Sequence, residues 1–472
     1  MGLYVSPISN ESLKNLCEQV GKNDHINPED FSRFHVKRGL RNSDGTGVMA
    51  GLTKICSVEG YYISDGERIP KEGRLVYRGI DINDIIENCV KEDRFGYEEA
   101  AWLLIFGSLP TPEQLKKFRD ILAQCRELPE DFNEDMIMKA PSPDIMNKLA
   151  RSVMALYSYD ENPDDISIEN VLRQCIQLIA QIPTIMTYAY QVKRRHYLHK
   201  SMYLHPINKE HSTAEFILNS LRADKKFTHE EAMLLDTCLI AHMEHGGGNN
   251  STFSTRVLTS SGTDTYSAIA AGIGSLKGPK HGGANKKVAQ MIACMKDEVN
   301  DLTNEDEIAA FIERVIRKET GDGSGLIYGM GHAVYTLSDP RAKILRDRAG
   351  KFSKGTDFEQ EFIALSLIEK LTPEVFEKIK GTKKKMCANV DLYSGLVYKM
   401  LGIPDDLFTP MFTVARVAGW SAHRLEELTS GKRIIRPAYK SVCLPGTYIP
   451  LAQRTCEICK GDMEYVPTEQ RD

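Results

Sequence analysis

A run of small side chains between Tyr266 and Leu276 constrains the fold of this chain more than any other stretch. The run reads YSAIAAGIGSL, so alanine and glycine supply much of its surface. A helix with so little side-chain bulk can lie close to another backbone, as the dense packing of a protein interior requires. Gly278-Pro279 ends the run, because proline cannot continue a helix. The chain is therefore predicted to contain closely packed helices.

A single histidine, His281, follows between Pro279 and the pair Gly282-Gly283. Glycine adopts backbone conformations closed to other residues, so a backbone or a ligand can come close to this imidazole. Two interpretations fit the stretch. His281 either lies in a tight turn that caps the next helix, or it faces a ligand. The stretch alone does not separate them.

The composition describes a large chain without extreme bias. Its 472 residues exceed the roughly 250–300 at which single cores stop growing, so two domains are expected. A net charge of −5 gives no general attraction to nucleic acid or to anionic membranes, so an anionic substrate would need locally gathered arginines. No apolar run reaches the roughly 18 residues of a membrane span. The 11 scattered cysteines favour reduced thiols, so a cytoplasmic location is expected.

Helical patterns dominate after residue 81, and a short β-like region precedes them. Apolar and aromatic runs between Leu52 and Tyr77 flank a turn at Asp65-Gly66, which predicts a small hairpin region. Thr111, Pro112 and Gln114 form the signature of a capped helix start. Because no strand–helix alternation follows, the fold is predicted to be mainly α. The predicted helices cover residues 12–21, 166–190, 213–221, 230–241, 305–317, 357–371, 373–380 and 410–429.

The C-terminal tail contains half of a zinc-binding pattern, Cys456 and Cys459. No second cysteine pair has matching spacing, although Cys443 could contribute a ligand. Reduced cysteines without metal are therefore the default interpretation, and zinc is the alternative. His242 and His245 also lack the further ligand and spacing of a metal site. No metal site is predicted.

A second histidine, His332, lies in the stretch Tyr328-Gly-Met-Gly-His-Ala-Val-Tyr335, again beside glycines. Asp339 and Pro340 then predict a helix cap and a first-turn proline. Arg341 would stand in the first turn of that helix, where a cation is mildly unfavourable. This placement favours a ligand-facing role for Arg341.

Asp391 lies in the stretch Asn389-Val-Asp-Leu-Tyr-Ser-Gly395. It could cap a helix, with Ser394 at the third position, or it could be a carboxylate on a semi-apolar segment that acts as a base. The motif alone leaves both interpretations open.

The order HGGAN, GMGHAVY, DPR and NVDLYSG resembles the citrate synthase family, and the resemblance extends from about Thr46 to Tyr439. It implies a mostly helical two-domain fold. Residues 1–280 and residues 396–472, including the tail, would form a large domain around a small domain of residues 281–395. The resemblance also implies at least a homodimer, with active sites between the domains.

The resemblance further implies the roles of individual residues. The catalytic positions are those of His281, His332 and Asp391. The oxaloacetate-binding positions are matched by His245, Asn249, Arg341, Arg416 and Arg436. Arg436 would come from the neighbouring subunit. The chain departs from the family at Gly246, where glutamate is common, and in its last thirty or so residues. His242 is expected to be a core or surface histidine.

The implied enzyme is an acyltransferase of the tricarboxylic acid cycle that joins acetyl-CoA to oxaloacetate and hydrolyses citryl-CoA. Asp391 would remove a methyl proton, while His281 would stabilise the charge forming on the thioester oxygen. His332 would donate to the ketone of oxaloacetate, and arginines would grip its two carboxylates. No metal or redox cofactor is needed.

Two other functions stay open. A 2-methylcitrate synthase would run the same chemistry on propionyl-CoA, and one added methylene is worth only roughly 1–3 kcal/mol in a pocket. An inactive homologue that acts as a binding protein is a third hypothesis. The sequence does not predict the preferred acyl-CoA, allosteric regulation, assembly beyond a dimer or the role of the tail.

Overall fold

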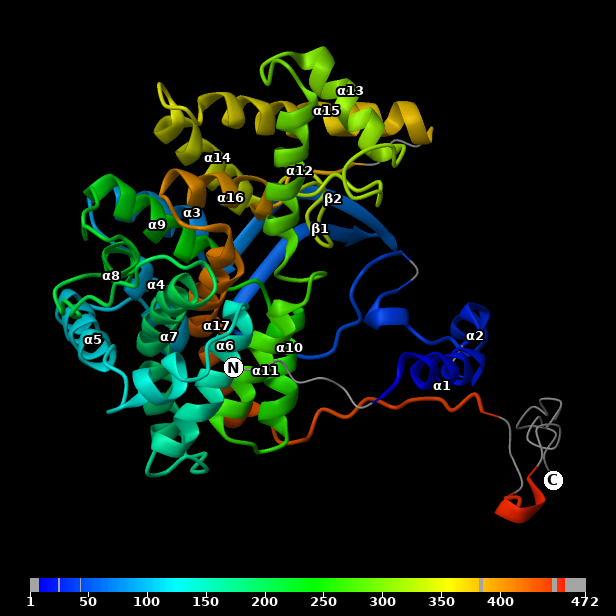
Figure 1. The fold of residues 1–472 in the computed structure, drawn as a ribbon, viewed down its shortest axis with the longest axis horizontal. Helices are drawn as coiled ribbons and strands as arrows, with labels where there is room; N and C mark the ends of the chain where they lie inside the picture. The colour runs from blue at the N-terminus through cyan, green and yellow to red at the C-terminus, as the bar shows by residue number, and fades with distance from the viewer. Residues whose placement is uncertain (1–7, 24–25, 43, 382–384, 444–447, 455–472) are drawn as a thin grey trace. The chain divides into compact units, whose positions relative to one another are not determined.

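The computed structural model describes residues 8–23, 26–42, 44–381, 385–443 and 448–454 (Figure 1). The chain forms two units. One comprises Met1–Val48 with Arg436–Asp472, and the other comprises Met49–Ile435. The first unit holds α1 (Asn10–Asn23) and α2 (Pro28–Arg33), and in it the Lys440 ammonium lies 5.5 Å from the ring centre of Phe34. The predicted limits of an inserted small domain stay a prediction.

Helices make up most of the second unit, so the prediction of a mainly α fold is confirmed. The α-helices of this unit are α3 (Ile82–Lys91), α4 (Tyr97–Phe106), α5 (Pro112–Cys125), α6 (Ile145–Leu156), α7 (Ile168–His196), α8 (Thr213–Leu221), α9 (His229–His242), α10 (Asn250–Ser260), α11 (Thr265–Lys277), α12 (Ala284–Glu298), α13 (Glu305–Ile316), α14 (Pro340–Ser353), α15 (Glu359–Lys380), α16 (Val390–Met400) and α17 (Phe408–Ser430).

The predicted hairpin is present and belongs to a three-stranded antiparallel sheet. The strands are β1 (Cys56–Ser64), β2 (Glu67–Tyr77) and β3 (Ile80–Asp81), in the order β1-β2-β3. Ser64 pairs with Glu67 across the predicted turn, where Asp65 and Gly66 have φ angles of 51° and 80°. Such positive angles suit a two-residue hairpin turn, because its twist matches that of the strands.

Local capping signals place the helix starts. At α5, Thr111 accepts a hydrogen bond from the Gln114 N–H at 3.2 Å, and Gln114 accepts one from the Thr111 N–H at 2.9 Å. This reciprocal pair is the predicted capping box. Asp339 caps α14, with Pro340 at its first position, also as predicted.

One helix prediction was wrong. Residues 357–371 and 373–380 do not form two helices but the single helix α15, which runs through Pro373. Proline removes one helical hydrogen bond and favours a break. Leu371 and Val375 are nevertheless buried on either side of it, so packing of a common apolar face keeps the helix continuous.

The small-residue run forms α11 and packs closely, as predicted. A Cβ atom added at Gly272 would lie 2.7 Å from Thr255 Oγ1 of α10 and 3.1 Å from the Trp420 ring of α17. Gly272 therefore lets three helices meet at distances that no side chain would permit. The helix ends at Lys277, immediately before the predicted break.

This contact predicts a stability difference between two glycines of one helix. Gly272→Ala should lower the free energy of unfolding by about 1–3 kcal/mol, because overpacking strains the core. Gly274→Ala is the control, since a Cβ there meets nothing within 4 Å. It should leave stability unchanged or raise it by up to about 1 kcal/mol. Denaturant unfolding measures both, and equal effects would contradict the packing account.

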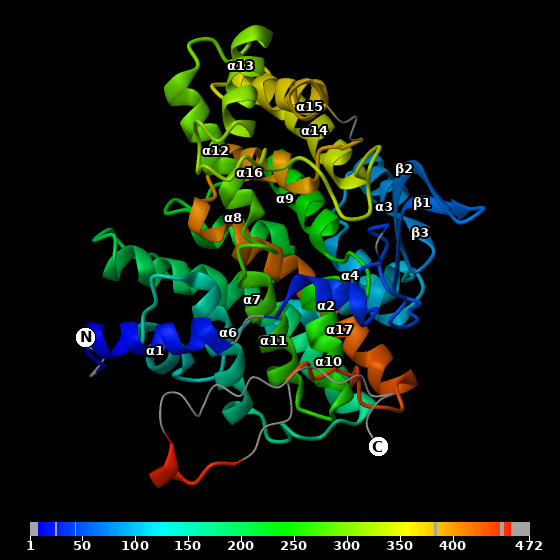
Figure 2. The same ribbon diagram turned by 90° about the vertical axis from the view of Figure 1, so that its right-hand side faces the viewer.

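Within the second unit, helices α12 to α16 gather at one end in both views, while α17 runs through the other helices (Figures 1 and 2). Of the two glycine-flanked histidines, His281 lies between α11 and α12, and His332 lies in the segment between α13 and α14. Among the described residues, no helix combines the length and apolar character needed to cross a membrane.

Candidate active site

His281 lies in the turn between α11 and α12, and the turn fixes its position. Its backbone N–H donates to Gly278 O at 2.9 Å, and the Gly282 N–H donates to Leu276 O at 3.0 Å. A Cβ at Gly282 would lie 2.3 Å from that same oxygen, so only glycine fits there. Gly283, not His281, is the N-cap of α12. His281 therefore lies in a tight turn that leads into the cap of the next helix, as the first interpretation predicted, and its side chain is not itself the cap.

The protonation of His281 follows from its partner in α10. The backbone N–H of Ser251 donates to His281 Nε2 at 3.3 Å, and Ser251 Oγ lies 3.0 Å from the same nitrogen. A backbone amide can only donate, so Nε2 accepts and the neutral ring carries its proton on Nδ1. Burial, with Arg416 adding to it, lowers the pKa of His281 to about 4. The imidazole is thus a neutral donor at pH 7.

A chain of hydrogen bonds connects His281 to Arg416 of α17. Ser251 Oγ donates to Asn249 Oδ1 at 2.9 Å, and Arg416 Nη1 donates to the same oxygen at 3.2 Å. Arg416 is buried, and its Nε donates to His242 O at 2.7 Å. Asn249 therefore joins the two predicted site residues and orients the guanidinium.

His332 also has its tautomer fixed by the backbone. Its Nδ1 accepts hydrogen bonds from the Val334 and Tyr335 N–H groups, each at 3.1 Å. The neutral ring therefore carries its proton on Nε2. The Tyr335 ring stacks on His332 with centroids 4.6 Å apart, which adds to the restraint. The loop of His332 therefore fixes the direction in which its Nε2–H can donate.

His245 lies against His332 with ring centroids 5.0 Å apart. It is buried, and its Nε2 has no hydrogen-bond partner within the described part of the chain. Burial first, and then the charges of Arg341, His332 and Arg416, hold the pKa of His245 well below its usual value. A buried nitrogen without a partner is costly unless a ligand satisfies it. His245 therefore fits a ligand-binding role.

The segment before Asp391 pairs with the loop that carries His332. Gly331 N–H donates to Cys387 O, and Asn389 N–H donates to Gly329 O, both at 2.8 Å. Gly329 has a φ of 86°, and a Cβ there would lie 2.9 Å from the Leu392 Cα. These contacts bring two segments that are far apart in sequence side by side.

Asp391 stands in the first turn of α16, and Asn389 is the cap. Asn389 Oδ1 accepts the Asp391 N–H at 3.0 Å, so the interpretation of Asp391 as the N-cap is wrong. Burial raises the pKa of Asp391 to about 6, with Asp339 adding to the rise and Arg341 and Arg416 opposing it. A carboxylate with a raised pKa is a stronger base than an exposed aspartate.

Arg341 is buried in the first turn of α14, where Asp339 holds it. Its Nε and Nη2 donate to the two carboxylate oxygens of Asp339 at 3.0 and 2.7 Å. Asp339 balances the cation that the helix start disfavours and fixes the direction of the guanidinium. The predicted ligand-facing arginine is thus already part of an ion pair with Asp339.

The second unit brings together seven of the eight predicted site residues: His245, Asn249, His281, His332, Arg341, Asp391 and Arg416. Arg436 belongs to the first unit and is exposed. His242 is a core histidine, as predicted: it is buried, its Nδ1 lies 2.7 Å from Cys238 O, and its ring meets Phe412 edge-on.

Sequence reasoning missed four supporting residues: Ser251, Tyr335, Asp339 and Asn389. Tyr335, Asp339 and Asn389 stand inside the motifs GMGHAVY, DPR and NVDLYSG, which were noticed for neighbouring residues, and Ser251 lies two residues after Asn249. Asp339 and Asn389 carry the ordinary signal of a helix cap, and that signal does not reveal what else the cap contacts.

Gly246, which departs from the family pattern, has a local reason to be glycine. Its φ is 85°, and a Cβ there would approach Val58 Cγ2 to 3.2 Å. A side chain at this position would therefore be strained.

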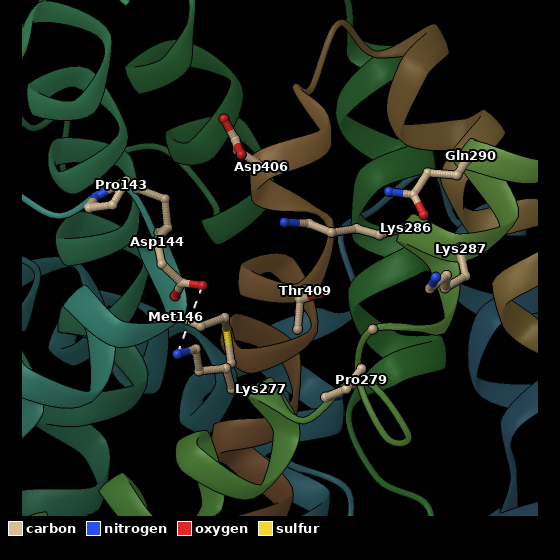
Figure 3. A pocket seen from close by; sticks show the side chains of 12 residues that line it. Pro143, Asp144, Met146, Lys277, Pro279, Lys286, Lys287, Gln290, Asp406 and Thr409 are labelled. Atoms are coloured by element: carbon tan, nitrogen blue, oxygen red, sulfur yellow. Dashed lines mark ion pairs between the residues drawn. The ribbon is translucent and has the colours of Figure 1, made fainter. Parts of the chain in front are cut away.

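A cavity of about 250 Å³ opens beside the His281 turn (Figure 3). Pro279 and Gly283 of the turn line it, and Lys286 and Gln290 extend towards it from α12. Lys277 lies across from them and pairs with Asp144 at 4.0 Å. A second cavity of about 180 Å³ shares Lys287 and Gln290 with the first. The two neighbouring cavities thus hold three lysines beside the His281 turn, of which Lys287 also pairs with Asp322 at 3.0 Å.

No group of three or more histidine, cysteine, aspartate or glutamate side chains suited to a metal occurs among the described residues. Cys456 and Cys459 lie outside the described residues, so the zinc alternative for the tail stays untested.

Comparisons with known proteins agree with the motifs. Residues 42–438 match the family model described as "Citrate synthase, C-terminal domain". The chain is 31% identical over 418 residues to the citrate synthase of Synechocystis sp., covering 88% of this chain and 94% of that one. It is 31% identical over 381 residues to the 2-methylcitrate synthase of Shewanella oneidensis, covering 80% and 92%.

A solved structure also has a similar fold. The citrate synthase of the archaeon Thermoplasma acidophilum, in a ternary complex with carboxymethyl coenzyme A and oxaloacetate, aligns with a TM-score of 0.70. Its sequence is 25% identical, and the alignment covers 88% of this chain and 99% of that one.

Proposed function

We propose, because the chain belongs to the citrate synthase family, that it condenses acetyl-CoA with oxaloacetate and hydrolyses citryl-CoA to citrate and CoA. One observation carries the proposal: backbone N–H groups fix the tautomers of two neutral histidines, His281 and His332. Each histidine then has an N–H on the opposite side of its ring. Such fixed donors stabilise oxygen atoms on which negative charge develops.

Asp391 is the proposed general base. It would take a proton from the methyl group of acetyl-CoA, a step that positioned side chains accelerate by roughly 10²–10⁴-fold. Its pKa of about 6 leaves it ionised at pH 7 yet closer to neutrality than an exposed aspartate. The proton leaves carbon as His281 Nδ1–H donates to the thioester oxygen, so the electron pair is held as an enol or enolate.

His332 would then donate from Nε2 to the ketone oxygen of oxaloacetate while the new carbon–carbon bond forms. His245 Nε2, buried without a partner among the described residues, can bind the same dicarboxylate. Arg341 and Arg416 supply positive charge for its carboxylates on a chain of net charge −5. A water molecule finally attacks the thioester carbonyl of citryl-CoA, which releases citrate and CoA.

The coenzyme A part of the substrate carries phosphates, which need cations. Lys286 and Lys287 of α12 line the cavity beside the His281 turn, and Lys287 also pairs with Asp322 at 3.0 Å (Figure 3). Lysine binds phosphate as a flexible point charge. This placement supports an acyl-CoA as the partner of the dicarboxylate.

We infer that the active form is a homodimer in which Arg436 comes from the neighbouring subunit. Two carboxylates require more charge than the site holds, because Asp339 already pairs with Arg341. Mixing inactive Arg436→Gln and His281→Ala subunits tests this. An exchanged arginine restores one intact site in each mixed dimer, whereas an arginine acting within its own chain restores none. Activity that stays at the level of the separate variants would contradict the exchange.

The similarity to the 2-methylcitrate synthase of Shewanella oneidensis supports a second candidate function, the same reaction with propionyl-CoA. Identities of 31% to both kinds of enzyme do not separate the two. One methylene changes pocket binding by only about 1–3 kcal/mol, so a few side chains at the acyl end decide the preference.

Product analysis tests the proposal. Purified protein is incubated with oxaloacetate and either acetyl-CoA or propionyl-CoA, and the acids formed are identified by mass spectrometry. Citrate as the faster product supports the first candidate, and 2-methylcitrate supports the second. Neither acid from folded protein would leave the inactive binding homologue. The reactions include EDTA, because side chains alone are proposed to carry the chemistry without metal or cofactor.

A cytoplasmic location completes the proposal. The nine cysteines within the described residues are all free thiols, which supports a reducing compartment. Activity in the soluble fraction of a cell lysate, separated from membranes and organelles, tests it.

A further inference from the structure

A buried ionic network lies directly behind the dicarboxylate-binding residues. Glu244 precedes His245, is fully buried, and accepts the His245 backbone N–H on Oε1 at 2.9 Å. Its backbone is held as well, because the Glu244 N–H donates to the Tyr77 hydroxyl at 3.2 Å. Gly419 of α17 abuts the other side, where a Cβ would lie 2.3 Å from Glu244 Oε2. The carboxylate is therefore packed in place.

His423 of α17 meets this carboxylate from the opposite direction. It is fully buried, and its Nε2 lies 3.2 Å from Glu244 Oε1, although the two are not aligned as a hydrogen bond in this conformation. On the other side of the ring, Arg256 Nη1 donates to Nδ1 at 3.0 Å. A guanidinium can only donate, so Nδ1 accepts and the neutral ring carries its proton on Nε2, towards Glu244.

Arg256 is anchored in turn. Its Nη1 donates to Glu426 Oε2 at 2.9 Å, and its Nη2 lies 2.7 Å from Glu427 Oε2. Glu426 also accepts the Lys54 backbone N–H at 2.7 Å. The network thus runs from the start of the β hairpin region through α10 and α17 to the residue before His245.

The network ends at groups that bind the substrate. Burial raises the pKa of the Glu244 carboxyl. His423, Arg416 and the His245 N–H together lower it by more, so the pKa lies below its usual value. A charged Glu244 favours the cationic state of Arg416, whose pKa burial lowers. Glu244 therefore influences both His245 and Arg416.

We infer that His423 is a positioning residue that, through Glu244, holds His245 and Arg416 in the geometry that binds the dicarboxylate. The inference rests on the proposed function. His423 touches no substrate, so it acts only through its neighbours. The proton on Nε2 keeps Glu244 turned towards the His245 backbone, and Arg256 keeps the proton on that nitrogen.

Oxaloacetate binding to the full-length protein, measured by calorimetry, tests the inference without turnover. His423→Leu removes the N–H that faces the Glu244 carboxylate at 3.2 Å and should raise Kd for oxaloacetate roughly 10-fold or more, because a buried charged group that loses its polar neighbour is costly. His423→Gln is the conservative variant, because its amide N–H can reach the place of Nε2 and should restore most of the affinity. Glu244→Gln, of the same shape without charge, should weaken binding as His423→Leu does.

Steady-state kinetics separates positioning from general damage. The His423→Leu and Glu244→Gln variants should raise KM for oxaloacetate and leave KM for acetyl-CoA unchanged. Arg424→Met is the matched control. Arg424 is also buried in α17, but it donates to Thr259, Thr263 and Thr265, away from the site. Its loss should lower Tm without changing the ratio of the two KM values.

Three results would overturn the inference. Unchanged oxaloacetate affinity in His423→Leu, or in Glu244→Gln if the leucine variant does not fold, removes the positioning role. Equal rises in both KM values, as expected from simple destabilisation, remove it too. If the wild-type protein binds no oxaloacetate, the proposed function fails and the inference fails with it. Wild-type binding with unaffected variants removes the inference alone.

Discussion

Replacing Asp391 by asparagine is expected to lower kcat by roughly 10²–10⁴-fold, because the amide cannot accept the methyl proton of the acyl-CoA. The side chain keeps its size in the first turn of α16, and the Asn389 cap on the Asp391 backbone N–H is untouched. Substrate binding should therefore change little. The measurement is kcat with saturating acetyl-CoA and oxaloacetate.

The pH dependence of the wild-type protein also tests whether Asp391 is the base. The pKa of Asp391 is about 6, so kcat/KM should fall about tenfold per pH unit below that value as the base becomes protonated. His281, with a pKa of about 4, stays neutral over this range and adds no second limb. If kcat/KM begins to fall only below pH 5, a group other than Asp391 is the base.

Stability provides the control for the asparagine variant. The folded-state pKa of Asp391 lies above its ordinary value of 3.8, so its stabilising contribution exists at low pH and is lost as the pH rises through about 6. At pH 7 the ionised, half-buried carboxylate is a cost to the fold. Asp391→Asn should therefore have a Tm equal to or above that of the wild type. A lower Tm together with lost activity would indicate damage to the fold instead of loss of a base.

Replacing His281 by alanine should lower kcat by roughly 10²–10³-fold, the effect of removing one donor to a developing oxyanion. The donor in question is Nδ1–H, because Ser251 N–H occupies Nε2. His281→Asn offers an amide N–H near the position of Nδ1 and should recover part of the rate. Stopped-flow detection of CoA release compares the three proteins.

The affinity for oxaloacetate distinguishes this role from a binding role. His281 reaches Arg416 only through Ser251 and Asn249, so its loss should leave KM for oxaloacetate nearly unchanged. An alanine variant with normal kcat and a raised KM for oxaloacetate would contradict the assignment of His281 as the donor to the thioester oxygen.

The sequence indicated which segments come together, but it did not indicate the contacts through which they do so. The glycines around His281 and His332 indicated close approach, and both the tight turn at Gly282 and the backbone pairing at Gly329 are of that kind. The tautomers could not be predicted. They depend on one backbone N–H contributed by Ser251, thirty residues before His281, and on two from the loop of His332 itself.

Three local sequence signals needed the fold for their interpretation. Asp391 and Asn389 both carry the signal of a helix cap, and only the position of the first turn of α16 shows that Asn389 is the one that caps. Arg341 was expected to face a ligand because a cation is unfavourable at a helix start. The structure shows a second way of balancing this cation, because Asp339, which caps the helix, also forms an ion pair with Arg341. Likewise, Pro373 indicated a helix break that side-chain packing overrides.

The most direct test of the central claim is oxaloacetate-dependent thiol release from acetyl-CoA, measured at pH 7 for the wild type, Asp391→Asn and His281→Ala. Release by the wild type should require oxaloacetate, and both variants should lose at least about 100-fold of it. Thiol release that is independent of oxaloacetate, or that survives in folded Asp391→Asn protein, would contradict that claim.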